Sequence, residues 1–215
     1  MHIVKIVVLG SAGVGKTAII EQFTTNTFRA EYCTTVRPVV KTRTVMLNSA
    51  SGFNRVYQLK IVDLPPVSSF PQNSLEEWSG GVSLRTASAY LLVYDASNLD
   101  TFHQLKLLKE QIYDSRDMNK VPVLIVANKY DALNPTAATS TQESRERRDI
   151  CSIVRKQWKL AHLECSAKYN WRIISLFKEI TRLCEILELA HAKDNLHTSH
   201  LEGFHPLNGE KCAIS

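Results

Sequence analysis

The fold of this chain is decided by the stretch IVKIVVLGSAGVGKT, residues 3–17. The apolar, β-branched run Ile3–Leu9 is typical of a buried strand, and a helical pattern begins at Lys16. The turn between them reads G-x-x-x-x-G-K-[ST], the phosphate-binding loop, although a glycine-rich turn without a ligand is the alternative. Glycines let backbone N–H groups and a helix N-terminus approach phosphate. We therefore expect a phosphate site built from Gly10, Ser11, Ala12, Gly13, Val14, Gly15, Lys16, Thr17 and Ala18.

Length and composition limit the classes of protein to which the chain can belong. Its 215 residues are 44% hydrophobic and 22% charged, which is ordinary for a soluble globular protein. There is no apolar run long enough for a membrane helix and no secretory pattern. Five widely spaced cysteines without a C-x-x-C pair fit a reducing cytosol better than a disulfide framework or a zinc site. The net charge of +5 is modest, so we expect no nucleic-acid partner.

Apolar strand patterns alternate with helical patterns along the chain. Residues 39–47 and 55–62 flank the turn cluster Asn48–Gly52, which predicts an antiparallel hairpin. Residues 26–37 and 64–85 show no period and predict loops. Further strands are expected at 3–9, 89–94, 121–127 and 163–165, and helices at 16–25, 99–117, 142–158 and 170–192.

This alternation predicts an α/β fold, in which a central, mostly parallel six-stranded sheet with one antiparallel hairpin strand carries helices on both faces. Ligands of such sheets bind beyond the carboxyl ends of the strands. The phosphate loop, Asp63, Asn128–Asp131 and Ser166–Lys168 all follow strands, so they are expected to converge at one edge. We expect one globular domain over residues 1–192 and a flexible tail over residues 193–215.

The order and spacing of these motifs resemble the Ras superfamily of small GTPases over residues 3–190. The resemblance rests on Gly10–Thr17, Thr35, Asp63, Asn128–Asp131 and Ser166–Lys168. The run Leu64–Trp78 is similar to a smaller branch, the atypical Ras-like family 10 subgroup. The resemblance implies a P-loop NTPase fold of the Ras-like G-domain type and a monomeric signalling switch that binds GTP or GDP with Mg²⁺.

The N-K-x-D run has a chemical reason, because guanine presents an N1–H and an amino group that one ionised aspartate can accept. Asp131 would therefore select guanine over adenine, which disfavours an ATP-using enzyme. Asn128 would join the base site to the phosphate loop, and the Lys129 stem would cover the base plane. A plain turn is the alternative for so short a motif. The resemblance adds base contacts from Phe28, Ser166, Ala167 and Lys168.

A magnesium site is expected beside the phosphate loop. Thr17 would supply a hydroxyl ligand, and Asp63 would hold the ion directly or through water. Thr35 matches the family position whose hydroxyl completes the metal shell when the γ-phosphate is present, and the adjacent Thr34 is the alternative. The resemblance places Lys16 and Thr35 in the catalytic machinery.

Three departures from the family pattern predict slow hydrolysis of GTP. The pattern D-x-x-G-Q reads Asp63-Leu64-Pro65-Pro66-Val67 here. Pro66 lacks the backbone N–H that the glycine gives to the γ-phosphate, unless Ser68 or Ser69 substitutes for it. Val67 cannot orient water as the usual glutamine does, and the Ala12 methyl crowds the same space. The runner-up hypothesis is a constitutively loaded pseudo-GTPase that serves as a binding module.

The last residues, Cys212-Ala213-Ile214-Ser215, form a C-a-a-X motif of the farnesylated type. One prenyl chain gives only marginal membrane binding, so we expect a cytoplasmic protein with weak peripheral association, at the plasma membrane. Basic residues at Arg37, Lys41 and Arg43 predict effector or regulator proteins with acidic contact surfaces; a solvated edge strand is the alternative.

Overall fold

The centre of the computed structural model, which describes residues 2–48, 54–66, 79, 84–133 and 141–201, is a six-stranded sheet. The strand order is β2-β3-β1-β4-β5-β6. Only the β2–β3 pair is antiparallel, so the predicted hairpin strand and the mostly parallel sheet are both confirmed. The strands are β1 (His2–Leu9), β2 (Val39–Asn48), β3 (Asn54–Asp63), β4 (Ala89–Asp95), β5 (Val123–Asn128) and β6 (Ala161–Glu164).

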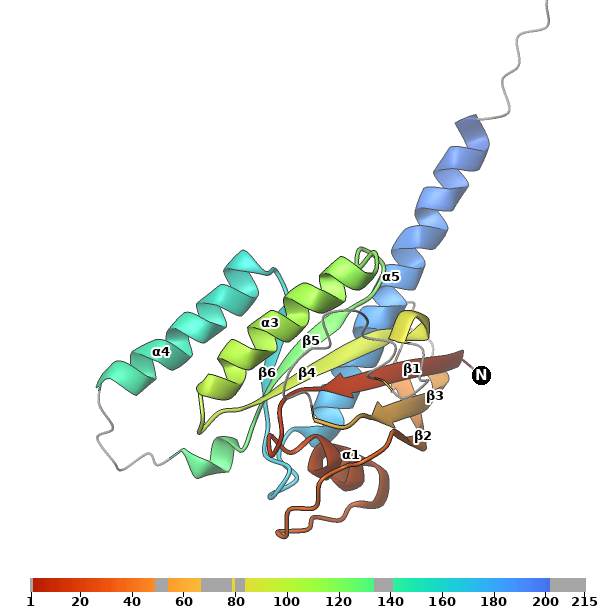
Figure 1. Cartoon of the computed structure of the whole chain (residues 1–215). Coiled ribbons are helices and arrows are strands. Elements are labelled where there is room, and N and C mark those ends of the chain that lie inside the picture. Colours follow the sequence, from red (N-terminus) through yellow and green to blue (C-terminus); the bar gives the residue numbers. More distant parts are fainter. Residues whose placement is uncertain (1, 49–53, 67–78, 80–83, 134–140, 202–215) are drawn as a thin grey trace, which may run out of the picture.

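Helices cover both faces of this sheet, as predicted (Figure 1). Apolar side chains at helical spacing in α1 and α5 pack on one face, where the Phe23 and Phe177 rings stack at 3.8 Å. Phe102, Leu105, Leu108 and Ile112 of α3 pack on the other face, beside α4. The helices are α1 (Lys16–Thr25), α3 (Asp100–Ser115), α4 (Thr141–Ser152) and α5 (Ile173–Leu201).

Burial of the strands follows their place in the sheet. Every residue of β4 and β5 is buried, because helices cover both faces of these central parallel strands. The edge strand β2 alternates instead, with Lys41, Arg43 and Val45 partly buried and their neighbours exposed. Because β3, β1, β4 and β5 run parallel, their carboxyl ends present the following loops at one edge of the sheet.

Several element boundaries differ from those predicted. The last helix starts at Ile173 and runs to Leu201, beyond the expected end at residue 192, because the first helix-breaking residue after it is Gly203. The division into a domain over 1–192 and a tail over 193–215 stays a prediction. The predicted helix 142–158 is α4 followed by a π-helical segment, Ile153–Gln157.

Three sequence-based predictions fall on residues that the structure does not describe. Outside the described ranges lie residues 49–52 of the predicted turn, Val67 with Ser68 and Ser69, and the C-a-a-X motif that begins at Cys212. Pro65 and Pro66 are the last described residues before that second gap.

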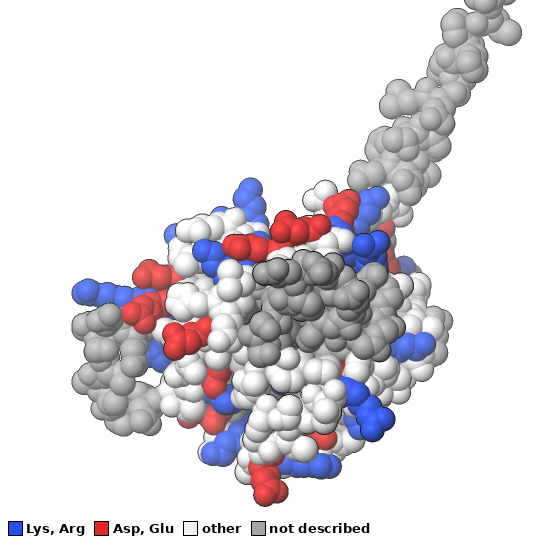
Figure 2. Space-filling view, viewed as in Figure 1, with Lys and Arg blue, Asp and Glu red and all other residues white. Residues whose placement is uncertain are grey.

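Charge is distributed without a single dominant patch on the face shown in Figure 2, where Lys and Arg side chains alternate with Asp and Glu. Among the helices within the described ranges, none has the length and apolar character that crossing a membrane requires. The four cysteines that the structure describes, Cys33, Cys151, Cys165 and Cys184, are free thiols.

Candidate functional site

The loop between β1 and α1 adopts the conformation that its glycines permit. Gly10, Gly13 and Gly15 all have positive φ angles, of 149°, 72° and 93°. Lys16 turns back over this loop, and its Nζ donates hydrogen bonds to the carbonyls of Gly10 at 2.8 Å and Ser11 at 2.9 Å. Burial lowers the pKa of Lys16 to about 8, although the charge of Asp63 opposes that shift. The loop thus holds a buried cation next to backbone N–H groups.

Beside this loop, three oxygen-bearing side chains meet. The Thr17 hydroxyl donates to Asp63 Oδ2 at 2.6 Å and lies 3.0 Å from the Thr35 hydroxyl. Thr35 also donates to Asp63 Oδ2, at 3.4 Å. Strand β3 positions Asp63, and the loop after α1 brings Thr35 across from the first turn of the helix. The structure therefore brings together the three residues that the sequence predicts for a metal site.

The donor set suits Mg²⁺. Asp63 is 4% exposed, and its second carboxylate oxygen, Oδ1, is buried without a hydrogen-bond partner among the described residues. Burial raises the pKa of Asp63, against the hydrogen bond from Thr17 and the charge of Lys16. A hard divalent cation with carboxylate, hydroxyl and water ligands would satisfy that oxygen and favour the ionised form. Thr34 is exposed and forms no described contact to Asp63, in contrast to Thr35.

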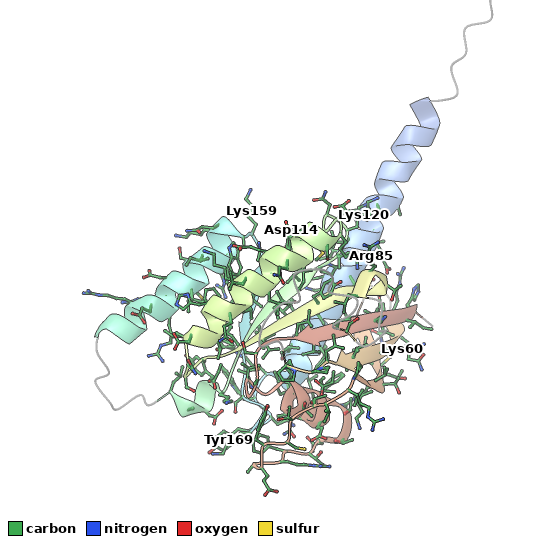
Figure 3. All side chains as sticks on the ribbon, in the orientation of Figure 1. Lys60, Arg85, Asp114, Lys120, Lys159 and Tyr169 are labelled. Carbon is green, nitrogen blue, oxygen red and sulfur yellow. The ribbon has the colours of Figure 1, made fainter. Side chains whose placement is uncertain are left out.

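The predicted base-recognition loops are joined to each other and to the phosphate loop. The Asn128 amide nitrogen donates to the Val14 carbonyl at 2.9 Å, and its Oδ1 accepts from the Ala167 backbone N–H at 3.1 Å. The Ser166 hydroxyl donates to Asp131 Oδ1. These bonds hold the carboxyl ends of β5 and β6 together. Tyr169, labelled in Figure 3, marks the loop after β6, at the same end of the molecule as α1.

The close approach of Asn128 to the phosphate loop requires a glycine at position 15. A Cβ at Gly15 would lie 2.3 Å from the amide nitrogen of Asn128, and the φ of 93° disfavours any other residue. Gly13 is different, because a Cβ there would meet nothing within 4 Å. The last glycine of the motif is thus fixed by the contact with Asn128 as well as by the phosphate that it is expected to face.

A cavity of about 460 Å³ opens over the phosphate loop, a size suited to a small-molecule ligand. Its wall includes Phe28 and Lys129, which are expected at the base, and Thr17, Thr35 and Asp63, which are expected at the metal; the expectations for Phe28 and Thr35 come from the family resemblance. Further predicted residues in the wall are Gly13, Gly15, Lys16, Ala18 and Pro66.

Other predicted residues lie behind or beside this wall. Asn128 is 1% exposed and supports the phosphate loop from the protein interior, through its hydrogen bond to Val14. Ala12 is exposed, and the ammonium of Lys168 lies 5.2 Å from the centre of the Tyr169 ring.

Sequence reasoning missed two contacts of this site. Lys129 has a left-handed backbone (φ 60°), and its ammonium forms an ion pair with Asp95 at 2.7 Å. Asp95 ends β4 as Asp63 ends β3, so its position at a strand end was the signal available. Ser11 of the phosphate loop donates a hydrogen bond to Gln104 of α3. Gln104 belongs to no recognised motif, so the sequence offered no signal for this contact.

One predicted basic side chain on β2 has a structural partner. The Arg43 guanidinium lies 4.7 Å from the centre of the Phe23 ring, on the α1 side of the strand. Lys41 lines the cavity, and Arg37 is exposed in the preceding loop. Of the three, Arg37 is therefore the most accessible to another protein.

Comparison with known proteins agrees with this geometry. The model of the Ras family matches residues 5–186. Human Ras-like protein family member 10B is 40% identical over 83% of this chain and 84% of its own length. Mouse Ras-like protein family member 10A is 36% identical over 98% of this chain and 97% of its length, and the GTP-binding protein Di-Ras2 of Macaca fascicularis is 29% identical over 83% and 80%. The hydrogen bonds that join the phosphate and base loops are consistent with these matches. This chain therefore belongs to the Ras family of small GTPases and is similar to its family 10 members.

Proposed function

We propose that this protein binds GTP and GDP together with Mg²⁺ and works as a signalling switch whose intrinsic hydrolysis is slow. The observation that carries the proposal is the pairing of two sites across one cavity. The Thr17–Thr35–Asp63 cluster faces the phosphate loop, and the hydrogen bonds of Asn128 tie that loop to the base loops. A nucleotide bound there would contact both sites at once.

Magnesium would be held by Thr17, by Asp63 directly or through water, and by Thr35 when the γ-phosphate is present. The ion would neutralise charge on the β- and γ-phosphates. Lys16 would add a second cation on the outer phosphates, in place of its hydrogen bonds to the Gly10 and Ser11 carbonyls. Thr35, which reaches Asp63 from a loop, is the residue whose position would depend on the third phosphate.

Base selection would come from Asp131. Its Oδ1 accepts a hydrogen bond from Ser166, which orients the carboxylate and leaves the other oxygen and remaining lone pairs for guanine. The backbone N–H of Ala167 already donates to Asn128, so Asn128 fixes the peptide that the resemblance places beside the base. Adenine presents an acceptor where guanine presents N1–H and would be rejected.

Slow hydrolysis is supported by residues at the γ-phosphate end of the cavity. Pro66 lines the cavity where the family pattern has a glycine, and proline has no N–H to donate. Val67 follows at the position of the usual glutamine, and Ala12 replaces the usual glycine in the phosphate loop. An arginine finger contributes roughly 10³- to 10⁵-fold to the rate of hydrolysis, so a cavity in which it cannot take its usual position would hydrolyse GTP far more slowly.

The second candidate function, a loaded pseudo-GTPase that serves as a binding module, is favoured by the same three residues. Both functions share every nucleotide-binding residue and differ in turnover. Nucleotide released from the purified protein should be guanine nucleotide, and single-turnover hydrolysis of bound [γ-³²P]GTP should be far slower than in a family member that keeps D-x-x-G-Q. A protein that retains GTP throughout supports the binding module, and an empty or ATP-loaded protein contradicts both.

Partners and location form the last part of the proposal. Cys212 would carry one farnesyl chain, which gives weak, reversible association of a cytoplasmic protein with the plasma membrane. The exposed Arg37, beside the cavity, would attract effectors or regulators with acidic surfaces. Monomeric behaviour and the absence of a nucleic-acid partner remain part of this proposal.

A further inference from the structure

A group of metal-ligating side chains lies on the opposite face of the sheet from α1 and α5. His162 and Glu164 come from the edge strand β6, and Cys151 comes from the end of α4. One ligand atom from each residue lies within 4.8 Å of the others, and all three side chains are half-buried. None of the three lines the nucleotide cavity. This cluster has no role in the proposed GTP site.

We propose that Cys151, His162 and Glu164 form a binding site for Zn²⁺ or a similar divalent transition metal. The Cys151 sulfur lies 3.4 Å from His162 Nδ1. Two ligands at adjacent corners of a zinc tetrahedron lie about 3.5 Å apart, given bonds of about 2.3 Å to sulfur and about 2.0 Å to nitrogen. A thiolate, an imidazole and a carboxylate are zinc ligands, and three of them leave one corner for water.

The ring of His162 is held in the orientation that a metal ligand needs. Its other nitrogen, Nε2, lies 3.0 Å from the Tyr94 hydroxyl, and the two rings stack at 6.0 Å. An Nε2–H donated to Tyr94 leaves the Nδ1 lone pair directed at Cys151, and metal-binding histidines commonly donate their other ring N–H to a fixed partner in this way.

The charges around the cluster permit a divalent cation. Cys151 as thiolate and Glu164 as carboxylate supply two negative charges. Arg172 lies 3.9 Å from Glu164 Oε2, with both side chains partly exposed, so the carboxylate can turn toward the metal at small cost. Arg155 donates to the His162 carbonyl at 3.4 Å, and Arg147 of α4 is a further cation whose charge acts on Tyr94, so the two anionic ligands are what the cluster offers a metal.

The local chain brings these ligands together over a short span. The H-x-E spacing on β6 places His162 and Glu164 on one face of the strand, because side chains two residues apart share a face. Cys151 precedes the π-helical segment Ile153–Gln157, a rare conformation that is frequent at functional sites. The chain then turns back through Lys159, labelled in Figure 3, which has a φ of 56°.

Metal binding would replace the proton of the Cys151 thiol. The S–H bond breaks, the proton leaves to solvent, and the sulfur donates an electron pair to the metal without any change in oxidation state. His162 and Glu164 each donate an electron pair and lose nothing. A bound metal would fasten α4 to β6, the strand that leads into the base loop at Ser166–Lys168.

Titration of the full-length protein with Co²⁺, in excess Mg²⁺ and GDP, tests the proposal. A cysteine ligand to Co²⁺ gives a near-ultraviolet thiolate charge-transfer band, which the oxygen ligands of a nucleotide site cannot produce. We expect this band to saturate at one equivalent and to disappear when one equivalent of Zn²⁺ is added. No band, or a band that grows without saturation, overturns the proposal.

Variants assign the band to these residues. Cys151→Ser should abolish the band, whereas the matched control Cys33→Ser, at an exposed cysteine of the cavity wall, should retain it. Tyr94→Phe keeps the ring and should weaken Zn²⁺ binding roughly 10- to 100-fold, because the hydroxyl that orients the His162 ligand is lost. Glu164→Gln should weaken it as well. Retention of the band in Cys151→Ser contradicts the assignment, provided that the metal-free melting temperatures of the variants agree.

Discussion

The side-chain amide of Asn128 donates a hydrogen bond to the backbone carbonyl of Val14 over 2.9 Å, and so joins two loops that lie far apart in the sequence. Its oxygen accepts from Ala167 at the same time. One buried side chain therefore connects the phosphate loop, the loop after β5 and the loop after β6. The relative position of phosphate and base in the cavity depends on this residue.

Replacement of Asn128 by alanine should weaken nucleotide binding. The change leaves the buried Val14 carbonyl and Ala167 N–H without their partner, at about 1–3 kcal/mol each. We expect a fluorescent GDP analogue to dissociate at least roughly 10-fold faster, measured by stopped flow. Asn119→Ala, at an exposed asparagine after α3, is the matched control and should leave the rate unchanged. Equal dissociation rates in both variants would show that the hydrogen bonds of Asn128 do not position the nucleotide.

Two of the three glycines of the phosphate loop, Gly13 and Gly15, should differ in their tolerance of alanine. Gly15→Ala puts a methyl group 2.3 Å from the Asn128 amide, so either this hydrogen bond or the loop must move. Gly13→Ala meets no atom within 4 Å and adds only the strain of a left-handed residue, about 1–2 kcal/mol. We expect calorimetry to find GDP binding lost in Gly15→Ala and largely kept in Gly13→Ala. The reverse order would contradict the steric account.

Asp131→Asn should change the base that the site prefers. An asparagine offers one acceptor and an N–H donor, whereas guanine presents two donors and xanthine presents a carbonyl at the position of the guanine amino group. Hydrogen bonds to a charged group contribute about 1.5–3 kcal/mol, so GTP affinity should fall roughly 10- to 100-fold and XTP affinity should rise. Competition of GTP and XTP against a fluorescent GDP analogue measures both. Unchanged GTP affinity would exclude Asp131 from base recognition.

Restoring the usual residues at the γ-phosphate end should accelerate hydrolysis. Pro66→Gly returns a backbone N–H, Val67→Gln returns a side chain that can orient water, and Ala12→Gly clears space beside them. We expect each single variant to raise the single-turnover rate and the triple variant to raise it most. Pro65→Gly is the control, because the neighbouring proline does not occupy the position of the usual glycine. A triple variant as slow as the natural chain would place the cause elsewhere.

Membrane association should depend on Cys212. Removal of the thiol in Cys212→Ser removes the site for a farnesyl chain, whose single anchor gives only marginal binding. A fluorescent fusion of the natural sequence should show partial recovery in the membrane fraction, and the Cys212→Ser fusion should be wholly soluble. Cys184→Ser is the control, since Cys184 is buried in α5. Equal distribution of all three fusions would remove the prenylation proposal.

The order of the elements and the identity of the nucleotide loops can be derived from the sequence alone. The run Ile3–Leu9 followed by Gly10–Thr17 requires a strand, a tight turn and a helix, because local periodicity and glycine spacing act over a few residues. The same local signals located α3 from Phe102, Leu105, Leu108 and Ile112. The end of the last helix was misplaced at residue 192, because no glycine or proline stands between that residue and Leu201 and composition alone marks helix termini poorly.

Several contacts between side chains become known only from the way the elements pack together. The ion pair of Lys129 with Asp95, the contact of Thr35 rather than Thr34 with Asp63, and the Arg43–Phe23 contact join residues from different elements. The pairing of Cys151 with His162 likewise depends on how α4 packs against β6. Such contacts are set by strand order and helix packing, which depend on the summed burial of many distant residues. The local sequence marks the end of a strand, as at Asp95, but does not identify the partner that the side chain meets there.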